Sequence, residues 1–258
     1  MRIIEANREY IYSLMKGIYD QLAHKPKVAE VGVLKGKNAA SIYEIMQPEL
    51  MLLIDAWSSS QVKEYRAINS HRAWVDDPVK HEFYYGGPID EQTTFDNIFL
   101  DVKSKFADKS DVQIIKADSQ KAFEILTKKK HKNFDFIYLD ASHQYEVVLD
   151  DLMNYRTLLD DKIGCFQLND CCHSEAGARQ NLGVLEAANK FCKLAKFEPV
   201  VAINRDFTDV LLAPVGSPMI QNINVMLDYN NISYVEVPNA LFPNLSVSVG
   251  KRPNVSFV

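Results

Sequence analysis

Short apolar runs alternate with helical stretches along most of this chain, and this alternation limits its fold more than any other feature. The runs at 27–34 and 50–56 do not place a polar residue at every second position, which is typical of parallel strands covered on both faces. Further strands are predicted at 112–117, 134–139 and 164–168, followed by a hairpin of 200–204 and 209–213. Helices are predicted at 3–23, 38–46, 119–129, 145–159 and 176–195. We therefore expect a doubly wound α/β domain with a mostly parallel, seven-stranded sheet.

Two regions do not follow the alternation. Residues 57–95, after the second strand, are too long for a plain loop and are rich in aromatic side chains. They are either a structural insertion with its own small core or a lid over the edge of the sheet. Residues 215–258 predict a β-rich extension of short strands and turns, which either joins copies of the chain in a homo-oligomer or covers the substrate side. We place the domain at 1–214 and the extension at 215–258.

Charge and cysteine content narrow the classes of function. The net charge of −5 argues against a nucleic-acid partner, which would need a basic surface. No apolar stretch has the length of a membrane span. The four cysteines form no Cys-x-x-Cys pair, so they predict neither a disulfide framework nor a zinc site. A reduced, cytoplasmic compartment and a small-molecule partner fit this pattern best.

The first predicted strand ends in a glycine turn that suits a ligand. Glu30, Gly32 and Gly36 form the pattern Glu-x-Gly-x-x-x-Gly, where glycines let backbone approach a bound molecule and a helix begins with free N–H groups. Dinucleotide-binding loops have the tighter spacing Gly-x-Gly-x-x-Gly. The turn therefore favours a ligand without a pyrophosphate, although paired glycines at turns are usually structural.

Acidic residues follow the next two strands. Asp55 ends the second strand, where a carboxylate can accept hydrogen bonds from both hydroxyls of a ribose. Asp118 and Ser119 end the third strand, where a carboxylate can accept from an adenine amino group. Each acid could instead cap the helix that follows it, above all Asp118. Together with the glycine turn they predict one nucleoside at this edge of the sheet.

Hard oxygen ligands follow the fourth and fifth strands. Asp140 and the pair Asn169–Asp170 lie at the ends of neighbouring predicted strands, and carboxylate and amide oxygens suit Mg²⁺ or another divalent metal. The alternative is that Asp140 caps a helix and that the pair makes a turn; we favour the metal. His143 is the best candidate for a general base, with His173 as its rival.

These residues resemble a known family. The Glu30–Gly32–Gly36 turn, Asp55, Asp118–Ser119 and Asp140-Ala-Ser-His143-x-Tyr145 are similar to class I S-adenosylmethionine-dependent methyltransferases, which have a Rossmann-like fold. The last of these motifs, with a helical Asp-Leu after it, resembles the group of macrocin-type sugar O-methyltransferases and cephalosporin hydroxylase-like proteins. The resemblance implies that Gly32, Asp55 and Asp118 bind S-adenosylmethionine and that Asp140 and Asp170 hold a divalent metal. Asn169 departs from the pattern, since the sugar-modifying members carry an acid there.

The sequence thus predicts a metal-assisted O-methyltransferase that acts on a hydroxyl of a sugar or another small polyol-like metabolite. In this mechanism the metal and a base activate the hydroxyl, which must be aligned with the methyl group. Two alternatives stay open: a nicotinamide-dependent oxidoreductase on the same fold, and a non-catalytic binding protein that retains the fold.

Overall fold

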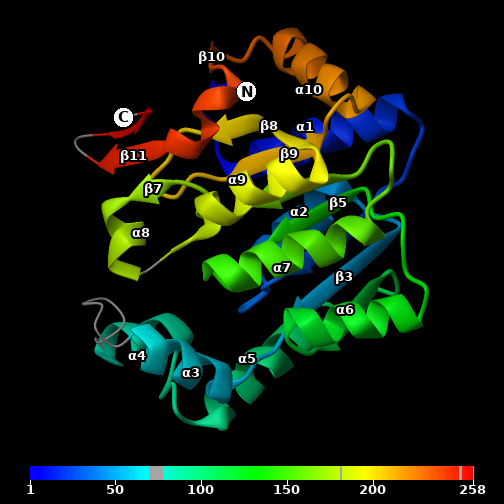
Figure 1. Ribbon diagram of the computed structural model, residues 1–258. Helices are drawn as coiled ribbons and strands as arrows, with labels where there is room; N and C mark the ends of the chain where they lie inside the picture. Colours follow the sequence, from blue (N-terminus) through cyan, green and yellow to red (C-terminus); the bar gives the residue numbers. More distant parts are fainter. Residues whose placement is uncertain (70–77, 181, 250–251, 258) are drawn as a thin grey trace.

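The main sheet is built from strands that are far apart in the sequence. The computed structural model describes residues 1–69, 78–180, 182–249 and 252–257. Among these residues, nine strands form the main sheet, with the bounds β1 (Arg2–Ile4), β2 (Lys27–Val31), β3 (Leu50–Asp55), β4 (Val112–Lys116), β5 (Phe136–Leu139), β6 (Cys165–Leu168), β8 (Phe197–Ile203), β9 (Val210–Pro214) and β10 (Tyr234–Glu236). Their spatial order is β10-β1-β8-β9-β6-β5-β2-β3-β4, and Figure 1 labels β10, β8, β9, β5 and β3 of this series.

The sheet is mostly parallel, as the unalternating apolar runs predict. Only β9 and β10 run against their neighbours, and β8 and β9 form the expected antiparallel hairpin. From β2 the chain proceeds outward to β3 and β4 on one side, and β5 then pairs with β2 on the other side. The order of the strands therefore reverses between β2 and β5. The carboxyl ends at such a reversal are where open α/β sheets bind their ligands.

The predicted number of seven strands is wrong, because β1 and β10 add two strands at one edge. The sequence predicts a helix from residue 3 onward, but Asn7 caps α1 (Arg8–Gln21) by accepting from the backbone N–H of Tyr10, so the helix begins after it. The preceding β1 pairs with β8 and β10. A three-residue strand is stabilised by such distant partners and leaves almost no local pattern.

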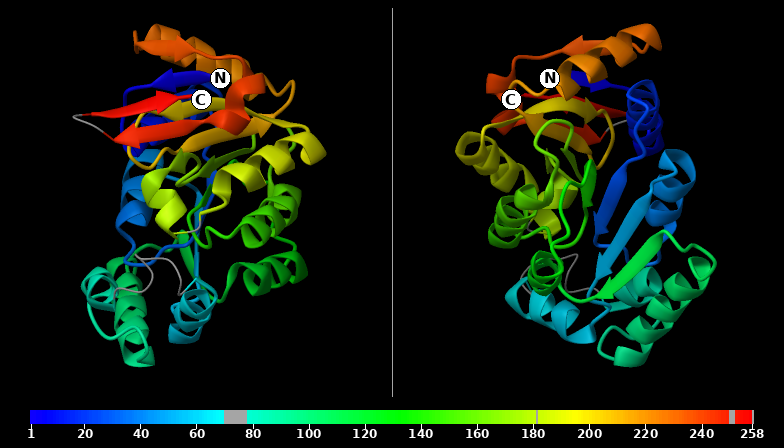
Figure 2. Two further views of the ribbon diagram at one scale, coloured as in Figure 1. Left: turned by 60° about the vertical axis from the view of Figure 1, so that its left-hand side comes forward. Right: turned by 90° about the vertical axis from the view of Figure 1, so that its right-hand side faces the viewer.

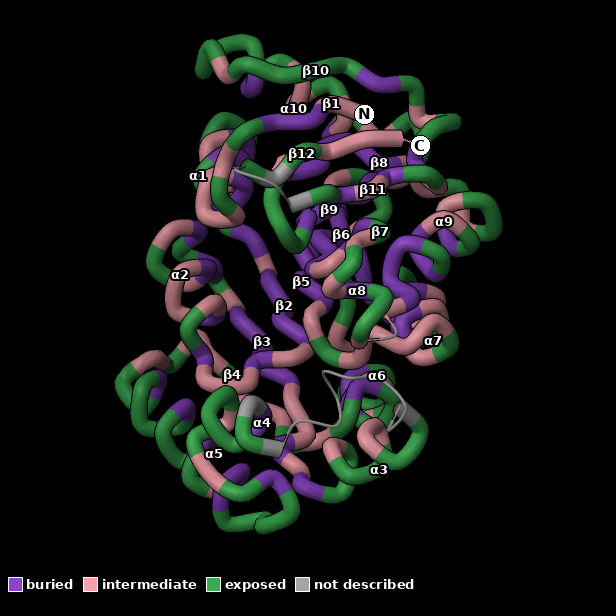
Figure 3. Tube along the Cα trace, turned by 90° about the vertical axis from the view of Figure 1, so that its left-hand side faces the viewer, coloured by how far each residue is buried: buried purple, intermediate pink, exposed green. Residues whose placement is uncertain are grey.

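Helices cover both faces of the sheet (Figure 2). One face packs against α1, α2 (Lys37–Met46), α5 (Gln92–Lys105) and α10 (Pro218–Tyr229). The other face packs against α6 (Ser119–Lys128), α7 (Tyr145–Tyr155) and α9 (Val184–Ala195). Figure 3 shows burial concentrated along the central strands, with exposed residues on the outer helices. In the part of the chain that is described, no helix is both long and apolar enough to span a membrane.

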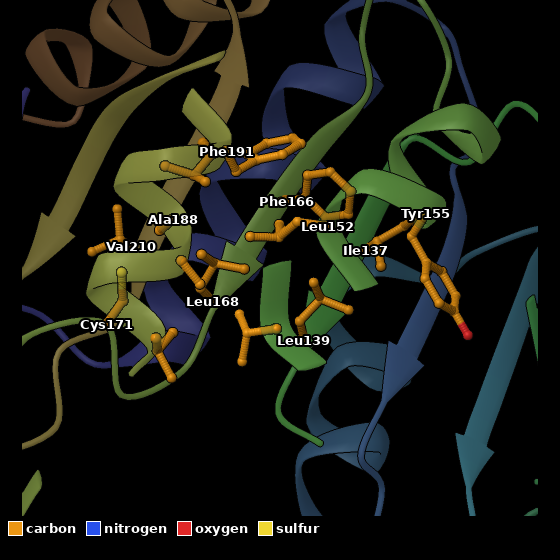
Figure 4. Packing of buried hydrophobic residues seen from close by; sticks show 14 of the residues in the cluster. Ile137, Leu139, Leu152, Tyr155, Phe166, Leu168, Cys171, Ala188, Phe191 and Val210 are labelled. Carbon is orange, nitrogen blue, oxygen red and sulfur yellow. The ribbon is translucent and has the colours of Figure 1, made fainter. Parts of the chain in front are cut away.

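A close view of the second face shows how its helices fit onto the strands. Leu152 of α7 and Phe191 of α9 lie over Ile137, Phe166 and Leu168 of β5 and β6 (Figure 4). All five side chains are fully buried. Each buried large apolar side chain stabilises the fold by about 1.5–3 kcal/mol, so this contact holds the ends of β5 and β6 in a fixed relation.

The insertion after β3 is helical. It contains α3 (Ser59–Asn69) and α4 (Pro78–Tyr85) and leads into α5; Trp74, one of its aromatic residues, lies outside the described residues. Both helices lie beyond the carboxyl end of β3 (Figure 1).

The extension at 215–258 is only partly β-rich, because it starts with the helix α10. Ser217 caps this helix and Pro218 stands in its first turn, where a proline favours a helix start rather than a turn. The extension then forms β10, and β11 (Ser246–Val249) and β12 (Pro253–Ser256) build a second, three-stranded sheet with β7 (His173–Ser174). The predicted helix at 176–195 is divided into α8 (Glu175–Gln180) and α9, with Gly183 as the N-cap of α9.

Candidate active site

The glycine turn after β2 packs against the end of β5. Gly32 has φ +94°, and a Cβ atom on it would lie 2.0 Å from the carbonyl oxygen of Asp140. Because Gly32 has no side chain, it packs directly against this backbone, and the ends of β2 and β5 can come close together. Gly36 has φ +66° and begins α2, where its Cα faces Val102 of α5. Both glycines shape the turn itself, and their predicted role toward a ligand stays a prediction.

Asp55 organises the same turn from the end of β3. Its Oδ2 accepts from the backbone N–H groups of Val33 and Leu34 at 2.9 and 2.8 Å, and its Oδ1 accepts from that of Trp57 at 2.7 Å. Leu34 and Trp57 have φ of 46° and 41°, a region that bulky side chains rarely adopt. Asp55 thus holds two strained residues in place. Since each carboxylate oxygen can accept two bonds, Oδ1 retains capacity for a ligand.

Glu30 is a buried acid with one unused oxygen. Its side chain is 1% exposed, and Oε1 accepts from Nδ2 of Asn38 at 2.9 Å. Asn38 in turn accepts from the hydroxyl of Tyr12 at 2.7 Å. Oε2 of Glu30 has no hydrogen-bond partner among the described residues, and burial raises the pKa of Glu30 to about 8. A buried acceptor of this kind calls for a donor from outside the chain.

Asp118 and Ser119 lie at the end of β4, where Asp118 acts as a helix cap. Its carboxylate accepts from the backbone N–H of Lys121 at 2.8 Å at the start of α6, and its side chain is exposed. Ser119 is buried, and its carbonyl oxygen accepts from the hydroxyl of Tyr155 at 2.8 Å. The capping alternative therefore describes Asp118 in this structure, while its role toward adenine stays a prediction.

The polar residues predicted at the ends of β5 and β6 do lie together. Nε2 of His143 is 3.2 Å from Oδ2 of Asp170 and 3.5 Å from Oδ1 of Asp140. Burial raises the pKa of Asp140 to about 7; His143 opposes this shift and Asp170 adds to it. Burial lowers the pKa of His143, but the contact with Asp170 and the charges of both acids outweigh it, so the pKa is raised. His143 is thus held as a basic group between two carboxylates.

Asn169 connects this cluster to a cation that the sequence interpretation missed. Nδ2 of Asn169 donates to Oδ1 of Asp140 at 3.0 Å, and Oδ1 of Asn169 accepts from Nη2 of Arg8 at 2.6 Å. The same Nη2 lies 3.2 Å from Oδ1 of Asp209, which is 3% exposed. Asp209 also accepts from Nε2 of Gln167 at 2.7 Å. Arg8 comes from the first helix, more than 150 residues away, so no spacing motif could have indicated it.

His173, the rival base, lies apart from these contacts. It starts β7, its side chain is 46% exposed, and Nδ1 lies 3.7 Å from Oε1 of Glu186. The extension holds this segment, because the backbone N–H of His173 donates to the carbonyl of Leu245 at 2.8 Å. Cys171 and Cys172 are buried free thiols whose pKa is raised by burial, so neither is an activated nucleophile.

The insertion contacts both sides of this edge of the sheet. Nζ of Lys35, in the glycine turn, donates to the carbonyl oxygen of Tyr84 in α4. The hydroxyl of Tyr65 in α3 donates to the carbonyl oxygen of Gln180 in α8 at 2.7 Å. Tyr84 is 52% exposed, and partial burial together with the charges of Asp140 and Asp170 raises its pKa.

Comparison with known families identifies the chain. The model of a family described as a methyltransferase domain matches residues 29–171, more than half of the chain. The chain belongs to this methyltransferase family. Because the match covers the strands from β2 to β6, the protein is a class I S-adenosylmethionine-dependent methyltransferase. No curated protein matches the sequence.

The solved structures that resemble this methyltransferase share little sequence identity with it. A Staphylococcus aureus protein assigned as a caffeoyl-CoA O-methyltransferase is 14% identical with a TM-score of 0.50, covering 81% of this chain and 85% of that one. The O-methyltransferase from Bacillus cereus in complex with SAH is 11% identical (TM-score 0.46, 81% and 83%). Fibrillarin from Aeropyrum pernix with bound S-adenosyl-L-methionine is 13% identical (TM-score 0.45, 80% and 74%). At such identities the likeness concerns the fold alone.

The residues of the methyltransferase fit S-adenosylmethionine at the glycine turn. The unpartnered Oε2 of Glu30 is a buried acceptor, and the cofactor carries a cationic amino group that would satisfy it. Oδ1 of Asp55 could accept from a ribose hydroxyl without giving up the turn. When bound, the cofactor supplies a methyl group on a sulfonium, which is already activated for transfer.

The residues do not fit a divalent metal as they are placed. Among the described residues, no group of three or more His, Cys, Asp or Glu side chains could hold a metal ion. Asn169, the predicted amide ligand, uses its oxygen to accept from Arg8. Asp140 and Asp170 both face His143. The predicted ligands of this methyltransferase therefore face Arg8 and His143, of which His143 is a cation only when protonated.

Proposed function

We propose that this methyltransferase transfers the methyl group of S-adenosylmethionine to a hydroxyl oxygen of a small sugar-like or other polyol-like metabolite. The observation that carries the proposal is the position of His143 between Asp140 and Asp170, at the sheet edge beside the glycine turn. A hydroxyl must lose its proton as its oxygen attacks the methyl group, and an imidazole with a raised pKa is suited to take it.

The roles within the site follow from the two ring nitrogens of His143. Nε2 is buried 3.2 Å from Oδ2 of Asp170 without a well-aligned hydrogen bond, so the carboxylates stabilise the ring by their charge once it is positive. Nδ1 is then the nitrogen that takes the proton of the acceptor hydroxyl, as in other carboxylate–histidine pairs. The acceptor oxygen must also lie in line with the methyl group, so positioning supplies much of the rate.

The acceptor class is proposed from the polarity of the edge. Carboxylate, amide and guanidinium groups lie there together, from Asp140, Asn169, Asp170 and Arg8. Such groups bind hydroxyl-rich molecules by hydrogen bonds rather than by apolar contact. The sequence resemblance to macrocin-type sugar O-methyltransferases favours the same class, and a reduced, cytoplasmic setting with free cysteines is part of the proposal.

Residues 57–95 are proposed to act as a lid on this acceptor. Their contacts reach the glycine turn through Lys35 and the segment after β6 through Gln180, so the insertion bridges the edge where the acceptor would lie. The extension at 215–258 supports the other side, since β11 pairs with β7 shortly after Asp170. Closure over the acceptor would exclude water from the transfer.

An acceptor screen by mass spectrometry tests the proposal directly. The full chain is incubated with S-adenosylmethionine and pools of sugars, sugar nucleotides and polyols, and products that gain one methyl group are fragmented to locate it. Methylation on a hydroxyl oxygen by the wild type but not by His143→Ala supports the proposal, provided that both bind S-adenosylhomocysteine equally. Methylation on nitrogen or carbon would contradict it. Cofactor binding without any transfer would favour the non-catalytic alternative, and the family match already disfavours the nicotinamide-dependent one.

A further inference from the structure

The predicted metal ligands are engaged by a guanidinium. A divalent metal such as Mg²⁺ needs several oxygen atoms that are free to face one point. Oδ1 of Asn169 accepts from Nη2 of Arg8 at 2.6 Å, and the amide nitrogen of Asn169 points toward Asp140. The amide is thus oriented with its oxygen on Arg8 and its donor on a carboxylate. In this orientation any metal at the Asn169 oxygen would lie beside the positive charge of Arg8, which disfavours its binding.

Arg8 is firmly anchored in this position. Its Nη2 also contacts the buried carboxylate of Asp209, and its guanidinium lies 5.5 Å from the centre of the Tyr138 ring. Asp209 is held in turn by Nε2 of Gln167 at 2.7 Å and by the hydroxyl of Tyr138 at 3.2 Å. A guanidinium stays charged at all relevant pH values. It therefore provides a permanent positive charge beside the acids.

The other two predicted ligands face a nitrogen. Nε2 of His143 lies within 3.5 Å of an oxygen of Asp140 and of Asp170, and a protonated ring there neutralises part of their charge. Between them, Arg8 and His143 contact all three predicted ligands. Arg8 brings one permanent positive charge, shared with Asp209, and His143 brings a second once it has taken up a proton.

We propose that Arg8 replaces the divalent metal in this methyltransferase, which therefore works without one. Arg8 is a positioning residue: it fixes the amide of Asn169, and Asn169 fixes Asp140 beside His143. The inference rests on the proposed function only in taking His143 as the base. It also explains why residue 169 is an amide where the resemblance leads one to expect an acid. A carboxylate at 169 could accept from Arg8 but could not donate to Asp140.

The metal itself provides the first test, without any acceptor. Free Mn²⁺ is followed by electron paramagnetic resonance as the full chain is titrated. Wild type should bind no stoichiometric Mn²⁺ in the cluster. Asn169→Asp combined with Arg8→Met removes the cation and adds a third carboxylate, and should bind Mn²⁺ roughly 10–100-fold more tightly than Asn169→Asp alone, which retains Arg8; this is the range over which altered metal surroundings change affinity.

Turnover provides the second test, with a matched arginine as control. Arg8→Met should lower kcat while leaving the affinity for S-adenosylhomocysteine unchanged, and Arg8→Lys should recover part of the loss because it restores the charge. Arg2 also pairs with an acid, Asp228 at 2.9 Å, and lies over the ring of Tyr234, so Arg2→Met controls for the loss of a partly buried, acid-paired arginine. Its kcat should equal that of wild type. Excess chelator should not change wild-type turnover.

One result would overturn the proposal. The proposal is wrong if wild type binds one Mn²⁺ per chain, if Asp170→Asn abolishes that binding, and if chelation abolishes turnover. The Mn²⁺ titration does not depend on any acceptor, so it decides the metal question even where no methylated product is found. Failure of the acceptor screen alone would instead count against the proposed function.

Discussion

The backbone N–H of Gly183 donates a hydrogen bond of 2.7 Å to the carbonyl oxygen of His143. This bond links the N-cap of α9 to the loop that carries the proposed base, so the position of His143 depends on a residue 40 positions later. A side chain cannot be added at Gly183 without moving that loop, because a Cβ there would lie 2.9 Å from Cβ and from the backbone nitrogen of Tyr145.

Gly183→Ala should therefore lower both stability and turnover. We expect the free energy of unfolding to fall by about 1–3 kcal/mol, the usual cost of overpacking, and kcat to fall because His143 shifts. Urea denaturation and steady-state kinetics measure the two effects. Gly216→Ala is the control: a Cβ there meets nothing within 4 Å, although φ of +79° makes it strained. It should lose stability but no activity, and equal kinetics in both variants would contradict the link to His143.

Asp55→Ala should be costly for folding, because it leaves the N–H groups of Val33, Leu34 and Trp57 without their acceptor. Hydrogen bonds to a charged group contribute about 1.5–3 kcal/mol each, but burying the Asp55 carboxylate offsets part of their sum, so we expect a net loss of about 2–4 kcal/mol in the free energy of unfolding. Asp118→Ala removes only an exposed N-cap and should cost about 1 kcal/mol. Chemical denaturation of both variants checks this; equal losses would mean that Asp55 does not organise the turn.

The affinity for S-adenosylhomocysteine should rise with pH as Glu30 ionises. Its pKa is raised from 4.5 to about 8 in the folded chain, so the folded state keeps a proton that the unfolded state loses, and unliganded stability falls between these pH values. A bound ammonium favours the ionised form and releases the proton.

Isothermal titration calorimetry in buffers of different ionisation enthalpy measures that proton release near pH 7. Glu30→Gln should abolish it, weaken binding by about tenfold or more, and reduce the fall of stability with pH, to which buried acids such as Asp140 also contribute. Glu44→Gln, at an exposed position, should change none of these. Proton release that persists in Glu30→Gln would assign the effect to another group.

The activity of the methyltransferase should rise with pH as His143 loses its proton, with an apparent pKa above 6.5, because Asp170 and Asp140 raise the pKa of this ring. His143→Ala should lower kcat by about 10²–10⁴-fold, the share of one general base. Asp170→Asn removes one of the charges that raise the pKa, so the rising limb of kcat/KM should move to lower pH. Asp108→Asn, at a 75% exposed position, should leave the profile unchanged. If the rising part of the kcat/KM profile stays at the same pH in Asp170→Asn, Asp170 does not raise the pKa of His143.

Tyr84→Ala should raise KM for the acceptor and leave the affinity for S-adenosylhomocysteine unchanged, if the insertion closes over the acceptor. The prediction follows from the contact of α4 with the glycine turn, where Lys35 donates to the carbonyl oxygen of Tyr84, and from the effect of Asp140 and Asp170 on the pKa of this half-exposed ring. Phe83 is the neighbouring aromatic residue and is 89% exposed, so Phe83→Ala provides a matched control with no expected effect on either constant. An identical KM in the two variants would argue for a purely structural insertion.

The succession of the central strands and helices along the chain could be predicted from the sequence. Parallel strands covered on both faces need continuous apolar runs, and the runs before Gly32, Asp55 and Asp140 are local signals that need no tertiary information. The meeting of Asp140, His143 and Asp170 was also predictable, since neighbouring parallel strands end at one edge of a sheet.

Tertiary structure alone decided what these side chains contact. The sequence could not show that Asp55 holds the glycine turn or that Arg8 reaches Asn169, because both depend on distances between segments far apart in the chain. Short edge strands such as β1 and β10 are stabilised by each other and by β8, so their own residues hardly indicate them. A carboxylate at the end of a strand looks the same in sequence whether it binds a ligand, caps a helix or holds a loop. Its neighbours in space make the difference.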